Sequence, residues 1–427
     1  MKNNYNSNVI ILLLLFTFQI GNCQGYYKDI FMDGGIKLNS MKRLPAADLL
    51  GLTIENYAST RYTSTYPPTY EDTLNQDKLI IGSKQDINGI LLYPDGQPRF
   101  RVLYVNGGIA TSHGKSLGEK GRERVRSFVL AGGSYVGTCA GAFLTAKGTI
   151  KADTIYPRNN YFGIWPGIAK ATRLTKSYTG MFIENNSPLL KYYDFGGDMY
   201  IDSIRHNGGC HAYEEEHYPD KTEVLLRYDH PPQKGKRDIH NKISAWAYKE
   251  NDYTGRIIAI GSHPEAITNG ERLELMAGLI KYALDGEGKP RIKDTLNNGE
   301  KRRMYKSTYD NDPDSTMIGD KQYHHFVVEI PRKAKNISVK LKGALGYDLF
   351  LYLKRDDFAF REDSDFKDIS LGAEKSMYFN KLEPGTWYLS VECNSTVEIV
   401  KTEWGYDYRG NTSVLNGVPY SILVNWE

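Results

Sequence analysis

Residues 132–144, Gly132-Gly-Ser-Tyr-Val-Gly-Thr-Cys139-Ala-Gly141-Ala-Phe-Leu144, decide the fold of this chain. An apolar pair, Tyr135 and Val136, leads into a cysteine with glycines two positions away on each side, and small or apolar residues follow at helical spacing. This pattern predicts a strand, a sharp turn and a helix, with Cys139 at the apex as in a nucleophile elbow. A helix N-terminus would favour the thiolate of Cys139 through unpaired N–H groups and the helix dipole. The alternative is a buried structural cysteine before a Gly/Ala-rich helix.

Two further segments place polar residues at the ends of predicted strands. Residues 101–105 predict a buried strand that ends in Asn106-Gly-Gly108, and residues 256–260 predict another that ends in Gly261-Ser-His-Pro-Glu265. An open parallel sheet has its site at the C-terminal ends of its strands. The elbow and both strand ends are therefore expected at one edge of one sheet.

These three motifs, in this order, resemble the class I glutamine amidotransferase superfamily. The sequence of residues 125–141 is most similar to the branch that resembles the N-terminal domain of some biotin–protein ligases, and Asn207-Gly-Gly-Cys210 and Ser262-His-Pro-Glu265 also fit that branch. The resemblance covers roughly residues 98–286. It implies a flavodoxin-like α/β fold, with an open and mostly parallel sheet flanked by helices. It also implies substrate contacts from two glycine-rich loops, at Gly107, Asn207, Gly208 and Cys210.

The residue types predict a covalent mechanism. The thiolate of Cys139 is expected to attack a carbonyl carbon, and His263 to take the thiol proton and deliver it to the leaving amine. Glu265 is expected to orient His263 and stabilise its charged form, because residues two apart in an extended segment project to one side. The resemblance implies the same Cys, His and Glu set. The N–H of Ala140 is expected to bind the developing oxyanion together with that of Gly108, as the superfamily's Gly-Gly loop does.

The beginning of the chain predicts secretion. Residues 9–20 form an apolar run after Lys2, too short and too close to the start for a membrane span, so residues 1–23 read as a signal peptide. Small residues at Gly21 and Cys23 suit cleavage before Gln24. The mature protein is then expected to be extracellular, or periplasmic in a bacterium, and a lipid-modified Cys23 is the alternative.

The remaining cysteines and the sequons say little about the fold. Cleavage would leave Cys139, Cys210 and Cys393, which are too few for a disulfide framework in so large a chain. An activated thiol at Cys139 fits this pattern, with the other two buried or paired. Glycosylation sequons, meaningful only in a eukaryotic host, begin at Asn185, Asn336, Asn394 and Asn411.

The 427 residues predict two domains after the signal peptide. Residues 24–286 are expected to form the amidotransferase-like domain, in which residues 119–130 and 269–284 predict amphipathic helices. Residues 287–320 are polar and predict a linker. The Asp-rich part of that segment is either a calcium site or, by preference, a solvated loop.

Only strand signals follow from residue 321 to residue 427. Their alternation and turn spacing predict a small β-sandwich. The stretches 346–352 and 382–391 resemble the bacterial pre-peptidase C-terminal domain, an appendage of secreted hydrolases. A generic β-sandwich is the alternative.

Charge and composition exclude several classes of function. A net charge of +3 gives no electrostatic case for nucleic acid binding, and no segment after residue 23 is apolar enough to cross a membrane. His211, His217 and the run 214–216 invite a metal site, but adjacent ligands do not give tetrahedral spacing. Neither a metal nor a cofactor is therefore expected.

The chain is therefore expected to be a stand-alone secreted cysteine hydrolase. It has no phosphate-binding glycine loop and no second α/β unit, so no synthetase domain that would use ammonia is expected. The expected substrate is a small molecule or peptide whose glutamine-type, γ-glutamyl-type or peptide amide is cleaved through a thioester. The alternative is a non-catalytic secreted binding protein that has kept the fold.

Overall fold

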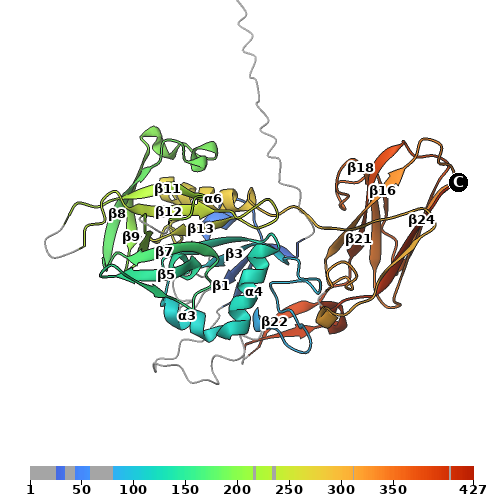
Figure 1. The fold of residues 1–427 in the computed structure, drawn as a ribbon, viewed down its shortest axis with the longest axis horizontal. Helices are drawn as coiled ribbons and strands as arrows, with labels where there is room; N and C mark the ends of the chain where they lie inside the picture. Colours follow the sequence, from blue (N-terminus) through green and yellow to red (C-terminus); the bar gives the residue numbers. More distant parts are fainter. Residues whose placement is uncertain are drawn as a thin grey trace, which may run out of the picture.

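The computed structural model describes residues 26–33, 44–57, 80–214, 218–232, 237–310, 312–402 and 405–427. They form an N-terminal lobe, residues 26–286, and a C-terminal lobe, residues 292–427, which lie side by side in Figure 1. The expected signal peptide lies outside the described residues, as does His217. No helix within the described ranges has the length and apolar character needed to span a bilayer.

The N-terminal lobe is built on a nine-stranded sheet in the order β2-β1-β3-β4-β13-β12-β11-β8-β9. Pairing is parallel from β2 to β13 and antiparallel from β13 to β9. The predicted α/β class is confirmed, and the sheet is mixed, with its parallel half carrying the elbow. Its strands are β1 (Lys28–Asp33), β2 (Ile54–Tyr57), β3 (Phe100–Val105), β4 (Ser134–Thr138), β8 (Ser177–Ile183), β9 (Tyr200–His206), β11 (Thr222–Asp229), β12 (Ile243–Tyr248) and β13 (Ile257–Ile260).

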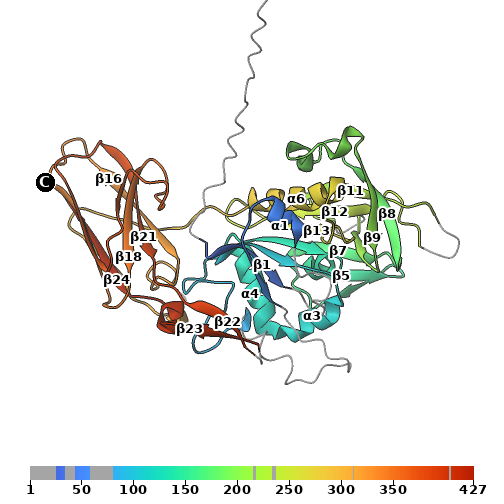
Figure 2. The same cartoon turned by 180° about the vertical axis from the view of Figure 1, so that it is seen from behind.

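Helices cover both faces of this sheet, as Figures 1 and 2 show. Successive strand residues point to opposite faces, so Val102 and Tyr104 of β3 join the core beneath α6, whereas Leu103 and Val105 join the core beneath α4. The two helices predicted from the sequence are confirmed to within one residue. The helices are α1 (Pro45–Leu49), α3 (Ala110–Ser116), α4 (Gly118–Leu130), α5 (Ala140–Thr145) and α6 (Gly270–Leu284).

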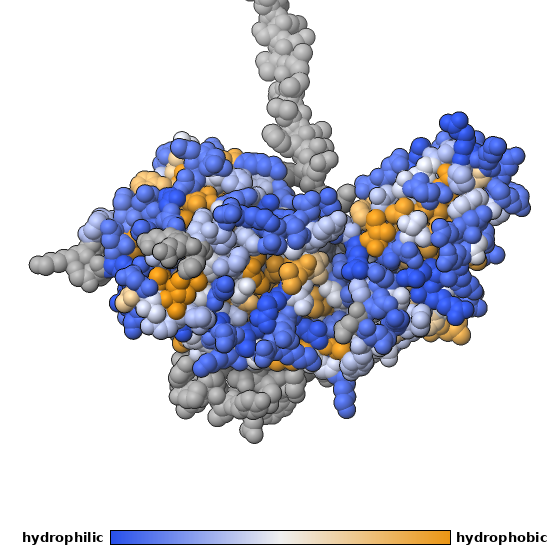
Figure 3. All heavy atoms as spheres, in the orientation of Figure 1, coloured by the Kyte–Doolittle hydropathy of each residue, from blue (hydrophilic) through white to orange (hydrophobic). Residues whose placement is uncertain are grey.

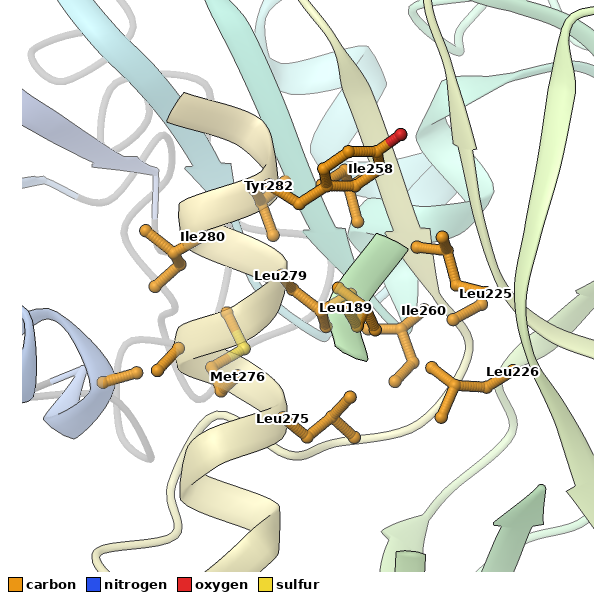
Figure 4. Packing of buried hydrophobic residues seen from close by; sticks show 14 of the residues in the cluster. Leu189, Leu225, Leu226, Ile258, Ile260, Leu275, Met276, Leu279, Ile280 and Tyr282 are labelled. Atoms are coloured by element: carbon orange, nitrogen blue, oxygen red, sulfur yellow. The ribbon is translucent and has the colours of Figure 1, made fainter. Parts of the chain in front are cut away.

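Packing of α6 on the sheet fixes β13, the strand that leads into the predicted His-Pro-Glu turn. Figure 4 shows Leu275 and Leu279 of α6 beside Ile258 and Ile260 of β13. All four side chains are fully buried, and each buried aliphatic side chain of this size contributes about 1.5–3 kcal/mol. The end of β13 is therefore held on a rigid support.

A second, four-stranded sheet in the order β10-β7-β5-β6 follows the elbow. Helix α5 ends after six residues, where the chain enters β5, so the helix that follows the elbow is short. The strands of this sheet are β5 (Ala146–Lys151), β6 (Thr154–Pro157), β7 (Trp165–Ala171) and β10 (Cys210–Ala212). Two short 3-10 turns, η1 (Pro188–Lys191) and η2 (Phe195–Gly197), connect β8 to β9.

The C-terminal lobe is a sandwich of two sheets, in the orders β14-β16-β21-β18-β19 and β15-β24-β17-β20. Alternate strand residues meet in one apolar core that includes Phe326, Leu351 and Ile422. The strands are β14 (Ile292–Thr295), β15 (Lys301–Met304), β16 (Tyr323–Ile330), β17 (Ile337–Gly343), β18 (Leu349–Arg355), β19 (Phe366–Asp368), β20 (Glu374–Phe379), β21 (Gly385–Cys393) and β24 (Tyr420–Asn425). A separate hairpin joins β22 (Glu398–Thr402) to β23 (Gly405–Arg409), and 3-10 turns lie at η3 (Thr308–Asp310) and η4 (Thr412–Asn416).

Residues 287–320, predicted to be a polar linker, contribute two edge strands to the C-terminal lobe. β14 pairs with β16, and β15 pairs with β24. Both strands are largely exposed, and the buried positions are Lys293 and Met304. Edge strands with so few apolar residues carry no alternation signal, which is why the sequence suggested a linker. The Asp-rich part forms ion pairs instead of a free loop, with Asp312 2.9 Å from Lys306 and Asp314 2.7 Å from Arg291.

Buried charges join the two lobes. Nη1 of Arg99 lies 2.7 Å from Oδ1 of Asp320, Nη2 lies 3.8 Å from Oδ1 of Asp86, and no side chain of the three is more than 2% exposed. The guanidinium also lies over the ring of Tyr93. The β22–β23 hairpin reaches back towards the N-terminal lobe, where Tyr408 donates a hydrogen bond of 3.1 Å to Asp86. On the face drawn in Figure 3, hydrophilic residues cover most of both lobes.

Candidate active site

Cys139 lies at the end of β4 in a strained backbone conformation. Its φ of 49° and ψ of −100° fall in a region that residues other than glycine rarely adopt. Such strain costs roughly 1–3 kcal/mol and persists only where the surroundings enforce it. Here the N–H of Cys139 donates to the carbonyl of Ile260 at 2.9 Å, which ties the turn to the end of β13. The predicted strand, sharp turn and helix are all present.

Close packing explains the glycines on each side of the cysteine. A Cβ at Gly137 would lie 2.5 Å from the carbonyl carbon of Gly141, and a Cβ at Gly141 would overlap the carbonyl oxygen of Val105 at the end of β3. The turn therefore folds onto itself and onto the neighbouring strand. Only hydrogen fits at either position, so the sequence pattern around Cys139 is a packing requirement.

His263 and Glu265 form a hydrogen-bonded pair beside the cysteine. Nδ1 of His263 lies 2.8 Å from Oε1 of Glu265, and their side chains are 18% and 5% exposed. Since Nδ1 binds Glu265, Nε2 is the ring nitrogen left to act on Cys139, whose Cβ and the His263 ring both lie against Gly107. Burial by itself lowers the pKa of His263, but the hydrogen bonds and charges of Cys139 and Glu265 outweigh burial and raise this pKa to about 10. The arrangement stabilises the imidazolium form of His263 beside the side chain of Cys139.

Gly107 forms one wall against which the imidazole packs. A Cβ at this position would overlap Cε1 of His263 and would lie 3.4 Å from Cβ of Cys139. The residue predicted to contact substrate therefore touches the two predicted catalytic side chains.

Gly107→Ala is expected to slow alkylation of Cys139 by iodoacetamide about 10²-fold, because a shift of about 1 Å in a reacting group can cost that much. The measurement is the alkylation rate at pH 6, followed by peptide mass spectrometry. Gly278→Ala in α6 is the matched control, since a Cβ there meets its nearest atoms at 3.6 Å. Equal alkylation rates in the two variants would contradict the assigned packing.

The two predicted oxyanion donors lie at the ends of neighbouring strands. Gly108 follows β3 in an exposed loop, with a φ of 155°, and Ala140 is the first residue of α5. β3 and β4 are paired in parallel, so both backbone N–H groups belong to the same edge of the sheet. This is the edge that carries Cys139 and His263.

The Asn207–Cys210 loop also reaches the cysteine, through its backbone. Sγ of Cys139 lies 3.8 Å from the carbonyl oxygen of Asn207, an exposed residue. Gly208 has a φ of 75°, and a Cβ there would meet Cγ2 of Thr175 at 4.0 Å. Cys210 differs from its neighbours because its side chain packs in the core beneath α4. Burial, and then the charge of Cys139, raise the pKa of the Cys210 thiol well above its usual range, so this thiol is suited to packing and not to nucleophilic attack.

A buried histidine, which sequence reasoning missed, supports the turn that carries His263. His206, at the end of β9, has Nδ1 2.8 Å from Oγ of Ser262 and Nε2 2.7 Å from Oγ1 of Thr172. Burial, followed by the charges of His263 and His230, lowers the pKa of His206 to about 3, so it is neutral. A second missed pair, His113 and Asp33, lies buried at 2.8 Å between α3 and β1. The sequence carries no local motif for either, because both depend on strands far apart in the chain.

Comparison with known proteins supports the resemblance drawn from the sequence. A family model described as biotin-protein ligase, N terminal, matches residues 94–158, which include the Gly-Gly loop and the elbow. The resemblance is confirmed over these residues. No curated protein matches the chain.

Solved structures that resemble this chain include two glutamine amidotransferases and one pre-peptidase C-terminal domain. A glutamine amidotransferase is 18% identical to this chain, with a TM-score of 0.34. The match covers 58% of this chain and 98% of the amidotransferase chain. The glutamine amido transferase from Methylobacillus flagellatus has 10% identity, 62% and 97% coverage, and a TM-score of 0.36. The pre-peptidase C-terminal domain of Bacillus anthracis collagenase has 14% identity, 33% and 100% coverage, and a TM-score of 0.20.

Proposed function

We propose that this protein is a cysteine-dependent amide hydrolase that acts on glutamine-type, γ-glutamyl-type or peptide amides. The observation that carries the proposal is the position of the strained Cys139 beside an imidazole that is itself bound to Glu265. A thiol with this pair of partners suits nucleophilic attack on a carbonyl. The apolar run 9–20 supports the further proposal that the protein is secreted.

The proposed reaction proceeds through a thioester. The thiolate of Cys139 forms a C–S bond to the amide carbon, and the oxygen takes the negative charge, stabilised by the N–H groups of Gly108 and Ala140. The C–N bond then breaks, and the imidazolium of His263 gives its proton to the leaving amine. Water adds to the thioester while His263 takes the water proton. The carboxylic acid leaves as the Cys139 thiolate re-forms and the His263 imidazolium is restored.

A panel of amides tests this proposal. Purified protein is incubated with glutamine, γ-glutamyl peptides and a peptide library, and released ammonia or amine is measured. Release from at least one class is expected, with a Cys139 thioester trapped by mass spectrometry at low pH. The absence of release from all three classes, with a thiol no more reactive than free cysteine, would instead favour a binding protein that has kept the fold.

Glu265→Gln is expected to slow alkylation of Cys139 by iodoacetamide at pH 6 about tenfold. An ordinary cysteine, with a pKa of about 8.5, is less than about 1% ionised at this pH, so fast reaction needs the imidazolium partner. Loss of the carboxylate removes part of what raises the pKa of His263 and so weakens the thiolate–imidazolium pair. The two proteins are expected to converge near pH 9, where the thiol of the variant ionises by itself. Equal rates at pH 6 would contradict the role of Glu265.

The raised pKa of His263 also has a signed effect on stability. The folded-state pKa of His263, about 10, lies above its ordinary value of 6.5. The stabilisation that the folded protein gains from the imidazolium form of His263 is therefore fully present below pH 6.5 and is lost as the pH rises through 10.

A further inference from the structure

An antiparallel bridge places an exposed arginine beside the candidate catalytic histidine. Arg205 of β9 is directly paired with His263, whose N–H donates to the Arg205 carbonyl at 2.9 Å. Arg205 is also directly paired with Tyr178 of β8. Side chains of directly opposed residues lie on one face, with Cβ atoms about 4.5–5.5 Å apart. Tyr178, Arg205 and His263 therefore form a row across three adjacent segments.

The neighbouring row of residues shows which face of these segments is buried. Ser177, His206 and Ser262 are opposed in the same register, and His206 and Ser262 are fully buried and hydrogen-bonded to each other. Successive residues of an extended segment point to opposite faces, so the row one residue further along must face outward. The outward row includes His263, whose ring meets Cys139, so the side chain of Arg205 starts on the face of the candidate site.

Arg205 carries an uncompensated charge on this face. It is exposed, and among the residues that the structure describes no ion pair involves its guanidinium. Tyr178, next in the row, is 62% exposed, an unusual position for so large a side chain. An arginine fork beside an aromatic surface suits a planar anion, because guanidinium binds carboxylate bidentately.

We propose that Arg205 binds an anionic group of the substrate, so that the preferred substrates are amides bearing a carboxylate near the scissile bond, with Tyr178 packing against the intervening chain. The inference rests on the proposed function, since it assigns a specificity residue to the same site. It selects acidic small molecules or acidic peptides over neutral ones. Arg205 makes no bond to the reacting atoms in the proposed reaction.

Two alkylating agents that differ in charge test the proposal without a known substrate. Iodoacetate is an anion and iodoacetamide is its neutral analogue, so the ratio of their rates at Cys139, followed by peptide mass spectrometry, reports a nearby cation. Arg205→Gln is expected to lower the iodoacetate-to-iodoacetamide ratio about tenfold, the effect of about 1.4 kcal/mol of charge-assisted binding. Arg173→Gln is the matched control, an exposed arginine on the loop after β7, and is expected to change the ratio less than about twofold at 0.15 M salt.

The outcomes separate this inference from the proposed function. A ratio unchanged in Arg205→Gln, or lowered equally in Arg173→Gln, overturns the assignment of Arg205. A ratio that falls only in Arg205→Gln supports it, whatever the absolute rates are. Slow alkylation by both reagents at pH 6 would reject an activated thiol, and with it the proposed function, while the ratio still decides the role of Arg205.

Discussion

Cys139→Ala is expected to lower amide hydrolysis by at least about 10⁴-fold, because loss of the nucleophile leaves only binding and oxyanion stabilisation. Cys139 has the strained elbow conformation that attack requires, and the ring of His263 lies beside it against Gly107. Alanine retains the same backbone strain and the smaller side chain fits. The variant is therefore expected to fold with a nearly unchanged melting temperature, measured alongside kcat/KM on the amide found active in the panel.

Cys393→Ala is the matched control for this change. Its thiol is fully buried in the core of the C-terminal lobe, and burial raises its pKa above the usual range. This variant is expected to retain hydrolysis while losing about 1 kcal/mol of stability through a small cavity. Hydrolysis that survives Cys139→Ala would eliminate the thioester mechanism.

Asp320→Ala is expected to destabilise the protein by about 3–5 kcal/mol, because it leaves the buried guanidinium of Arg99 without its closest counter-charge. The two groups are 2.7 Å apart and at most 2% exposed. Asp86, at 3.8 Å, is too distant to replace the lost contact. The measurement is the midpoint of unfolding in urea, followed by fluorescence from both lobes.

Asp314→Ala provides the comparison for this second change. Asp314 pairs with Arg291 at the same 2.7 Å, but the two side chains are 47% and 40% exposed. Solvent screens such a pair, so its loss is expected to cost no more than about 1 kcal/mol. Similar midpoints for the two variants would show that burial of Arg99 does not create the expected dependence on Asp320.

Local rules explain why the elbow was predictable from the sequence. Gly137 and Gly141 are needed because neighbouring backbone leaves no room for a Cβ, and that requirement is visible as a spacing around Cys139. His263 and Glu265 are two residues apart, so their hydrogen bond is also local. Helix α4 was predictable because its apolar residues, which include Val125 and Phe128, recur at helical spacing and are buried on one face.

The features that the sequence did not reveal depend on pairing across the fold. Arg205 faces the candidate site only because β9 is bridged to the turn after β13, 58 residues further along the chain (263 − 205). Strand β15 has a single buried residue, Met304, and gains its place by pairing with β24. Residues of this kind carry no periodic signal, since their partners and not their neighbours decide their structure.

The charge pairing between Arg99 and Asp320 bears on how this architecture can be recombined. A β-sandwich grafted onto an unrelated catalytic unit needs only a tolerant connection, whereas here each half supplies the counter-ion of the other. Exchange of either half with that of a distant homologue is expected to preserve stability only if the combined protein retains the arginine and its aspartates. The two halves are in this sense coupled by charge, and are not interchangeable modules.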